Sequence, residues 1–166
     1  MKKQNTIMMR AIFADCIYKE MQKNKNIYVV VNDLGYKMWD KIRDDFPDRF
    51  INVGAAEQTL IGVGIGLALS NKIPIVYSIT TFLLYRPFET IRNYIHYEKI
   101  PVKLIGAGRD RDYVHDGISH WAEEDKEIMK ILNNIESYWP NDIKEIPKLV
   151  AKIIKNNKPY YINLKR

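Results

Sequence analysis

The stretch FPDRFINVGAAEQTLIGVGIGLAL extends from Phe46 to Leu69 and carries the clearest structural pattern of the sequence. The short run at 50–53 predicts a strand, and residues 56–69 predict a helix with small residues on one side. A strand that leads directly into a helix is the unit from which α/β proteins are built.

The same alternation continues on both sides of this stretch. Further strands are predicted at 26–32, 73–77, 101–106, 135–138 and 160–164, and further helices at 81–97, 123–132 and 143–154. A helix before the first strand is indicated by a stripe formed by Ile7, Met8, Ala11, Ile12, Cys16, Ile17 and Met21. Alternating strands and helices predict an α/β fold: a three-layer, doubly wound, mainly parallel sheet with helices on both faces.

Polar and glycine-containing segments follow several of the predicted strands. They are Asp33 and the ranges 54–57, 78–82 and 106–120. In sheets of this kind, ligands bind outside the carboxyl ends of the strands. The predicted topology therefore brings the candidate functional residues to one edge of the sheet.

Length and composition exclude several classes of protein. The chain has 166 residues, enough for one domain with a core, and a net charge of +6. Its lysines are scattered among acidic residues, so no nucleic-acid partner is expected. No apolar run is long enough to span a bilayer, and no long apolar core follows Lys2 and Lys3, so no membrane partner or secretory signal is expected. The single cysteine, Cys16, cannot form an internal disulfide, and a cytoplasmic location is expected.

The phrase at 46–58, with its glutamate after a strand, resembles the pyrimidine-binding domain of transketolases, deoxyxylulose-phosphate synthases and the β subunits of 2-oxo acid dehydrogenases. In those families the glutamate hydrogen-bonds the aminopyrimidine ring of thiamine diphosphate. The resemblance gives Glu57 a catalytic and cofactor-binding role. Such a carboxyl group must remain a proton donor, which burial favours. Taken alone, Glu57 could equally be an acid that complements the helix dipole.

The segment at 78–89 is similar to a transketolase stretch in which Thr-Phe begins a helix that holds the aminopyrimidine. Phe82, Tyr85 and Phe88 are spaced by three and are expected on one helix face. Arg86 falls where split transketolases carry an arginine. The resemblance implies that all four residues bind the cofactor. The alternative is an aromatic stripe that faces the core, and this alternative is strongest for Phe88.

The phrase DGISH, from Asp116 to His120, resembles a loop of the same families that lies on the substrate side of the cofactor. By resemblance, His120 is a catalytic proton relay or a hydrogen-bond donor at the substrate carbonyl, and Asp116 is a polar substrate contact. Histidine suits this role because its charge changes near neutral pH. His96 and His115 have no such context and are interpreted as structural or surface residues.

Two weaker matches add substrate-binding candidates. Asp33 resembles the Asp-Leu turn after the first strand, but it could also cap a helix. Arg10 aligns with an arginine that binds substrate phosphate in transketolases, but it could also form a surface salt bridge.

The loop at 108–115 departs from the transketolase pattern. Transketolases carry a histidine about eight residues before the Asp of the DG phrase, and this chain has Gly108 there. Arg109 and Arg111 could bind a different anion, or they could pair with the neighbouring Asp110 and Asp112.

The chain lacks the motif that binds the diphosphate, a Gly-Asp-Gly phrase followed about 30 residues later by Asn-Asn, which holds Mg²⁺ (or Ca²⁺). Residues 1–166 are therefore interpreted as a single pyrimidine-binding domain without a metal site. The diphosphate-binding domain and the C-terminal transketolase domain are expected to be absent from the chain. A separate diphosphate-binding subunit and an α2β2 heterotetramer are implied. Its pyrimidine domains are expected to associate around the glutamate helix, where Gly62, Gly64 and Gly66 would permit close approach. Tight packing within the domain would explain these glycines equally well.

The resemblance implies the pyrimidine-binding subunit of a split, thiamine diphosphate-dependent transketolase. Such an enzyme transfers a two-carbon ketol unit, or performs a related carboligation, on sugars or sugar phosphates in carbohydrate metabolism. The alternatives are a β-type subunit of a 2-oxo acid decarboxylase or dehydrogenase, and a non-catalytic scaffold subunit, which would not need Glu57. A dinucleotide-binding domain is disfavoured because no G-x-G-x-x-G turn follows the first strand.

Overall fold

Six strands form one sheet in the order β2-β1-β3-β4-β6-β5, and all neighbouring strands are parallel. The structure is a computed structural model that describes residues 8–166. The strands are β1 (Ile27–Val31), β2 (Phe50–Asn52), β3 (Ile73–Ile79), β4 (Lys103–Ala107), β5 (Glu136–Tyr138) and β6 (Tyr160–Leu164). The expected parallel sheet is confirmed.

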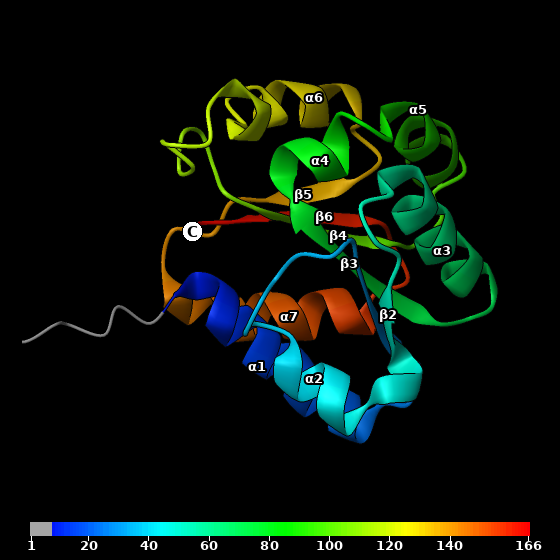
Figure 1. The fold of residues 1–166 in the computed structure, drawn as a ribbon. Helices are drawn as coiled ribbons and strands as arrows, with labels where there is room; N and C mark the ends of the chain where they lie inside the picture. The colour runs from blue at the N-terminus through cyan, green and yellow to red at the C-terminus, as the bar shows by residue number, and fades with distance from the viewer. Residues whose placement is uncertain (1–7) are drawn as a thin grey trace, which may run out of the picture.

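Helices cover both faces of this sheet (Figure 1). One face carries α1 (Met9–Lys23), α2 (Asp40–Asp45) and α7 (Ile146–Lys155). The other carries α3 (Glu57–Leu69), α4 (Thr80–Leu84), α5 (Phe88–Thr90) and α6 (Asp125–Ile131). Short turns of 3-10 helix occur at η1 (Pro47–Arg49), η3 (Ile118–His120) and η4 (Ile143–Glu145), and η2 (Ile91–Tyr97) is a π-helix. The predicted three-layer architecture is therefore confirmed.

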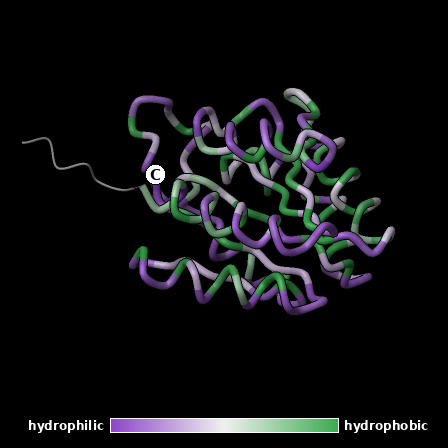
Figure 2. Tube along the Cα trace, turned by 90° about the horizontal axis from the view of Figure 1, so that it is seen from below, coloured by the Kyte–Doolittle hydropathy of each residue, from purple (hydrophilic) through white to green (hydrophobic). Residues whose placement is uncertain are grey.

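Two hydrophobic cores lie on opposite faces of the sheet. In β1, Val29 and Val31 face the core under α1 and α7, whereas Val30 faces the core under α3. A strand buried on both faces needs a continuous apolar run, which explains the β-branched sequence at 27–31. Figure 2 shows that hydrophobic and hydrophilic residues alternate along the outer helices, as expected for helices with one face on a core.

The strand order reverses at β1, because the chain passes from β1 to β2 on one side and then crosses to β3 on the other. Such a switch point opens a crevice at the carboxyl ends of the strands. The segments after β1 and β3 border this crevice, and α3 begins beside it.

Two sequence predictions were wrong. The expected helix at 81–97 is broken: α4 ends at Leu84, and Pro87 precedes α5. Proline lacks an amide hydrogen and disfavours helical conformation in the residue before it. Phe82, Tyr85 and Phe88 therefore do not share the face of one continuous helix.

The predicted stripe on the first helix was also wrong in part, although Ile12, Cys16, Ile17 and Met21 do pack against the core beneath this helix. The residues of α1 that are buried are Met9, Phe13, Ala14, Ile17 and Met21, so Met8 and Ala11 lie outside the buried face. Ile7 lies outside the described residues. So do the first residues of the chain, on which the argument against a secretory signal rests. Within residues 8–166, no helix is both long and apolar enough to cross a membrane.

Lys103 offers a test of this packing. It is buried at the start of β4 (2 % exposed), and its ammonium group donates hydrogen bonds to the carbonyl oxygens of Asn156 and Lys158. Burial lowers its pKa from the usual 10.5 to about 8. Between these two values the unfolded chain keeps a proton that the folded chain has released, so stability should rise with pH.

We expect the stability of the wild-type chain relative to Lys103→Met to increase by about 2 kcal/mol between about pH 7.5 and about pH 9.5. Urea unfolding of both proteins at the two pH values measures this. The methionine variant has the same other titrating groups, so the comparison isolates Lys103. A difference that stays constant with pH would contradict the buried, pKa-lowered ammonium group.

Candidate active site

Glu57 is the first residue of α3 and is buried (8 % exposed). The turn before it contains Gly54 in the left-handed region (φ 70°), and the Asn52 side chain accepts a hydrogen bond from the Gly54 amide at 3.0 Å. Glu57 Oε1 accepts hydrogen bonds from Asn32 Nδ2 at 3.0 Å and from Arg86 Nη1 at 2.7 Å. The side chain therefore has partners on the segments that follow β1 and α4, which a residue serving only the helix dipole does not need.

Arg86 joins this carboxylate to an aromatic face. Its guanidinium carbon lies 3.9 Å from the centroid of the Phe82 ring. The Arg86 side chain is half exposed (50 %), so solvent reaches the arrangement from one side. The structure thus brings together three predicted cofactor-binding residues, Glu57, Phe82 and Arg86.

The other two aromatics of this segment point elsewhere. The Tyr85 hydroxyl donates to Glu124 Oε2 at 3.1 Å. Burial, followed by this hydrogen bond, raises the pKa of Tyr85 above its ordinary value. Tyr85 also lines a cavity of about 390 Å³ together with Ile118 and Trp121. Phe88 packs against the core under α3, in agreement with its interpretation as a core residue.

His120 lies in η3 and faces Phe82. The two ring centroids are 4.9 Å apart in an edge-to-face arrangement. Ser119 Oγ lies 2.9 Å from His120 Nδ1, and Thr81 Oγ1 donates to the Ser119 carbonyl oxygen at 2.7 Å. Thr81 thus ties the histidine loop to α4. Among residues 8–166, only Nδ1 of this imidazole has a hydrogen-bond partner, so Nε2 is the nitrogen that can meet a ligand.

The two predicted acidic substrate contacts, Asp33 and Asp116, differ in the hydrogen bonds that hold them. Asp116 is exposed, and its carbonyl oxygen accepts a hydrogen bond from Ser119 Oγ at 3.5 Å. Asp33 has a left-handed backbone (φ 60°), its amide donates to Asn52 Oδ1 at 2.9 Å, and Asn52 Nδ2 donates to Asp33 Oδ1 at 3.3 Å. The interpretation of Asp33 as a helix cap was wrong, because α2 begins only at Asp40.

Arg10 lies between two tyrosine side chains. Its Nη1 is 3.5 Å from the Tyr113 hydroxyl. Burial raises the pKa of Tyr77 to about 12, and the nearby charge of Arg10 acts in the opposite direction. Arg10 Nε is buried without a partner, and the described part of the chain places no carboxylate within ion-pair distance of this guanidinium. The alternative of a surface salt bridge was therefore wrong.

The two loop arginines are already engaged. Arg109 is buried (5 % exposed) and donates to the carbonyl oxygens of Asn163 and Pro140. Arg111 forms an ion pair with Glu123 at 3.0 Å and covers the ring of Trp121. Their guanidinium groups do not pair with Asp110 or Asp112, which was one of the two alternatives. The contacts of Arg109 also use the groups that an anion would need, whereas within residues 8–166 Arg111 hydrogen-bonds through Nε alone and its side chain is 61 % exposed.

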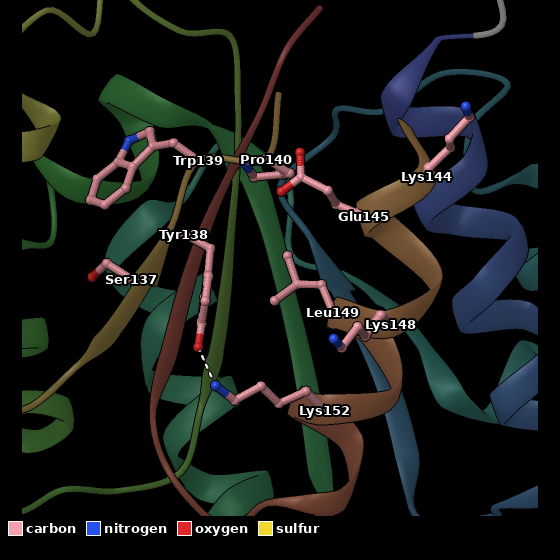
Figure 3. Close-up of a pocket in the computed structure, with 9 residues that line it drawn as sticks. All are labelled: Ser137, Tyr138, Trp139, Pro140, Lys144, Glu145, Lys148, Leu149 and Lys152. Carbon is pink, nitrogen blue, oxygen red and sulfur yellow. Dashed lines mark hydrogen bonds between the residues drawn. The ribbon is translucent and has the colours of Figure 1, made fainter. Parts of the chain in front are cut away.

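A cavity of about 630 Å³ lies elsewhere, between β5 and α7 (Figure 3). Tyr138, Trp139 and Leu149 are among its lining residues, and Lys152 hydrogen-bonds Tyr138 there. None of its lining residues belongs to the candidate site. The candidate residues instead gather at the carboxyl edge of the sheet, where Asp33 lines a smaller hollow of about 200 Å³.

Sequence reasoning missed four residues that shape this surface: Asn32, Thr81, Tyr113 and Ser119. Asn32 and Thr81 directly follow or adjoin strand ends, so position alone marks them as candidates. Ser119 lies inside the DGISH phrase. Tyr113 has no local signal, because its neighbours Arg10 and His120 come together only in the fold.

The fold is a doubly wound parallel α/β domain, and the candidate residues lie at the switch point of its sheet, the place where ligands bind in such sheets. The model of one family, described as the transketolase pyrimidine-binding domain, matches residues 5–166. The chain belongs to this family.

Several curated relatives are named as sections or subunits of transketolases. A protein of Methanocaldococcus jannaschii, named as the C-terminal section of a transketolase, is 31% identical over 159 residues, which are 95% of this chain and 50% of that protein. The 6-deoxy-6-sulfo-D-fructose transketolase subunit SqwH of a Clostridium species is 29% identical and matches 95% of this chain and 49% of its own length. The chain thus spans about half the length of the curated relatives it matches.

Solved transketolase structures contain a domain with the same fold as this chain. A split-gene transketolase, solved as an inactive β4 tetramer, superposes with a TM-score of 0.86 at 34% identity, over 96% of this chain and 51% of that chain. The transketolase of Leishmania mexicana superposes with a TM-score of 0.83 at 16% identity, over 95% of this chain and 25% of that chain. The second likeness concerns the fold alone.

Proposed function

We propose that this chain is the pyrimidine-binding subunit of a split, thiamine diphosphate-dependent transketolase-like enzyme that transfers a two-carbon ketol unit. One observation carries the proposal: the buried Glu57 carboxylate bonds a planar nitrogen group, the Arg86 guanidinium, which itself lies on the Phe82 ring. An aminopyrimidine needs the same two partners, a carboxyl oxygen and an aromatic face. The residues present therefore fit the cofactor.

Each residue of the candidate site has a defined task in this proposal. Thiamine diphosphate supplies a carbon nucleophile that also serves as an electron sink. Glu57 holds a proton at the oxygen that faces the aminopyrimidine, and Asn32 fixes the orientation of its carboxyl group. Phe82 stacks on the ring, which contributes about 1 kcal/mol beyond burial. In the complex with the cofactor, Arg86 moves aside from Glu57 and stays at the rim of the site. Tyr85 and Phe88 support the segment that carries Phe82 and Arg86.

On the substrate side, His120 uses Nε2 to donate a hydrogen bond or a proton to the substrate carbonyl oxygen. Ser119 engages Nδ1 and thereby sets the orientation of the ring. Asp33 and Asp116 bind hydroxyl groups of the sugar. Arg10, which has no carboxylate partner within the described chain, binds the anionic end of a sugar phosphate or a similar substrate.

A separate subunit completes the enzyme in this proposal. It supplies the diphosphate-binding half with Mg²⁺ or Ca²⁺, in an α2β2 heterotetramer that acts in carbohydrate metabolism in the cytoplasm. Three findings support it: the relatives include separate transketolase subunits, a similar β tetramer is described as inactive, and the candidate site is open on one side.

Co-expression with a partner that carries a Gly-Asp-Gly phrase tests the proposal. We expect thiamine diphosphate-dependent ketol transfer from the assembled enzyme and none from either chain alone, because each cofactor needs both halves of its site. Ketol transfer with this chain alone would contradict the split site. Decarboxylation of 2-oxo acids without ketol transfer would favour the dehydrogenase-type alternative. An assembly that binds no cofactor would favour the scaffold alternative.

The glycines of α3 have different environments that bear on self-association. A Cβ atom at Gly64 would lie 2.6 Å from Val76 Cγ2, so Gly64 lets the helix approach β3 within the domain. Cβ atoms at Gly62 and Gly66 would meet nothing within 4 Å. Only Gly62 and Gly66 are therefore available for contact with a second subunit.

We expect Gly66→Phe to weaken self-association about 10- to 100-fold, since overpacking a close contact costs about 1–3 kcal/mol. Sedimentation analysis measures the effect, and the melting temperature shows whether the domain stays folded. Gly66→Ala is the matched control: it should keep the assembly and raise helix stability by up to about 1 kcal/mol. An unchanged oligomer in Gly66→Phe would place the contact elsewhere.

A further inference from the structure

Gly108 and Tyr113 are packed against each other at the end of β4. Gly108 has a left-handed backbone (φ 86°), and its amide donates to the Leu164 carbonyl oxygen at 2.9 Å. A Cβ atom at this position would lie 2.2 Å from Tyr113 Cε2 and 2.5 Å from Cδ2. The tyrosine ring can therefore occupy its place only because residue 108 has no side chain.

Tyr113 is fixed from several sides and is nearly buried (9 % exposed). Trp121 Nε1 donates to its carbonyl oxygen at 3.1 Å, and the guanidinium of Arg166 lies 4.6 Å from the ring centroid. Its ring centroid is 5.7 Å from that of His120. The hydroxyl, at the other end, is 3.5 Å from Arg10 Nη1. One side chain thus links the proposed catalytic histidine to an arginine without an acidic partner in residues 8–166.

We propose that Tyr113 determines substrate specificity in the proposed reaction. Its ring forms the wall of the substrate site beside His120, in the space that a side chain at position 108 would enter. Its hydroxyl holds Arg10 for the anionic group of the substrate. This inference rests on the proposed function, and it selects a substrate class: short sugars or aldehydes whose far end carries a phosphate, sulfonate or carboxylate.

The chemistry of the surroundings favours an anion at this point. Burial raises the pKa of Tyr113, so the phenol stays neutral near pH 7 and can donate a hydrogen bond. A neutral phenol beside a guanidinium is complementary to an oxyanion. Arg109 cannot take this role, because its guanidinium group is bonded to carbonyl oxygens, and Arg111 pairs with Glu123 and lies on the Trp121 ring rather than against Tyr113.

The test uses the enzyme assembled with its diphosphate-binding subunit and compares three acceptors: glyceraldehyde, glyceraldehyde 3-phosphate and the longer ribose 5-phosphate. Tyr113→Phe removes only the hydroxyl, so KM for glyceraldehyde 3-phosphate should rise about 10-fold relative to KM for glyceraldehyde, which has no anionic group. Tyr113→Ala opens the wall, so kcat/KM for ribose 5-phosphate should rise about 10-fold relative to glyceraldehyde 3-phosphate. Tyr94→Phe, on η2, is the matched control.

Selectivity that both Tyr113 variants leave unchanged would overturn the inference, provided that the variants keep their melting temperature. An assembly without ketol transfer would instead contradict the proposed function. In that case, calorimetric titration with glyceraldehyde 3-phosphate still decides: binding should be about 10-fold weaker in Tyr113→Phe, and equal binding overturns the inference.

A double-mutant cycle tests the packing that underlies the inference. Gly108→Ala should destabilise the wild-type chain more than it destabilises the Tyr113→Ala variant, because only the wild type has a ring in contact with the added methyl group. Thermal unfolding of the four proteins measures this coupling. Equal effects in both backgrounds would show that the glycine does not hold the ring in place.

Discussion

Replacing Glu57 by alanine should lower kcat/KM for ketol transfer by about 10²–10⁴-fold in the assembled enzyme, the range that proton transfer by one positioned side chain contributes. The carboxyl group is buried at the switch point of the sheet, where Asn32 and Arg86 hold one of its oxygens. No other residue with such a placement can replace it, since Asp33 is exposed and faces Asn52. Steady-state kinetics with saturating thiamine diphosphate measure the loss.

Glu57→Gln is the matched variant because it keeps the size of the side chain and an oxygen for Asn32. An amide cannot exchange a proton as a carboxyl group does, so most of the activity should still be lost. Glu57→Ala also leaves the Asn32 amide without its acceptor, which costs about 1–3 kcal/mol of stability, so melting temperatures must accompany the kinetics. Wild-type activity in either variant would refute the assigned role.

Four of the six strands, β1, β3, β4 and β6, could be predicted because they are buried on both faces, whereas the edge strands β2 and β5 are only partly buried. A strand such as 27–31 must be a continuous apolar run, and such runs are visible without knowledge of the tertiary structure. All six predicted strands exist, with ends shifted by at most two residues. The aromatic spacing of three at 82–88 fits one continuous helix face, so only Pro87 marks the break of the predicted helix at 81–97. On α1 the pattern is less clear at the edges of the buried face, because the small or apolar residues Met8 and Ala11 are exposed.

The candidate site could be predicted in part, for a topological reason. Parallel strands end at one edge, so residues after β1, β2, β3 and β4 must be neighbours whatever the details of packing. This brings Glu57, Phe82 and His120 together. Charge alone gave less information: Arg10 and Arg109 look equivalent in the sequence, yet Arg109 binds buried carbonyl oxygens and Arg10 keeps its charge unpaired by any carboxylate among residues 8–166.

The residues on the cofactor side and those on the substrate side lie on separate segments, so mutations on the two sides should have different effects on turnover and on cofactor affinity. Glu57 and Phe82 lie on the cofactor side, whereas His120 contacts the Phe82 ring from a separate loop, which is held by Thr81, by ring contacts and by the hydrogen bond from Trp121 to Tyr113. A change on the loop should therefore alter turnover without altering cofactor affinity. A change at Glu57 should alter both.

His120→Ala should accordingly lower kcat by about 100-fold or more, while the Kd of thiamine diphosphate stays within about threefold of the wild-type value. Removal of the imidazole takes away the donor at the substrate carbonyl oxygen but leaves Glu57 and Phe82, the proposed contacts of the aminopyrimidine, in place. Kinetics with saturating cofactor and a fluorescence titration of cofactor binding separate the two effects.

Two further variants of the same loop serve as controls for the His120→Ala prediction. His115→Ala removes an exposed histidine five residues earlier and should behave as the wild type. Ser119→Ala removes the partner of His120 Nδ1, so it should lower kcat by about 3- to 10-fold, because an imidazole free to turn presents Nε2 correctly for only part of the time. If His120→Ala cannot bind thiamine diphosphate, the histidine acts on the cofactor side, and the proposed substrate side of this surface must be assigned to other residues.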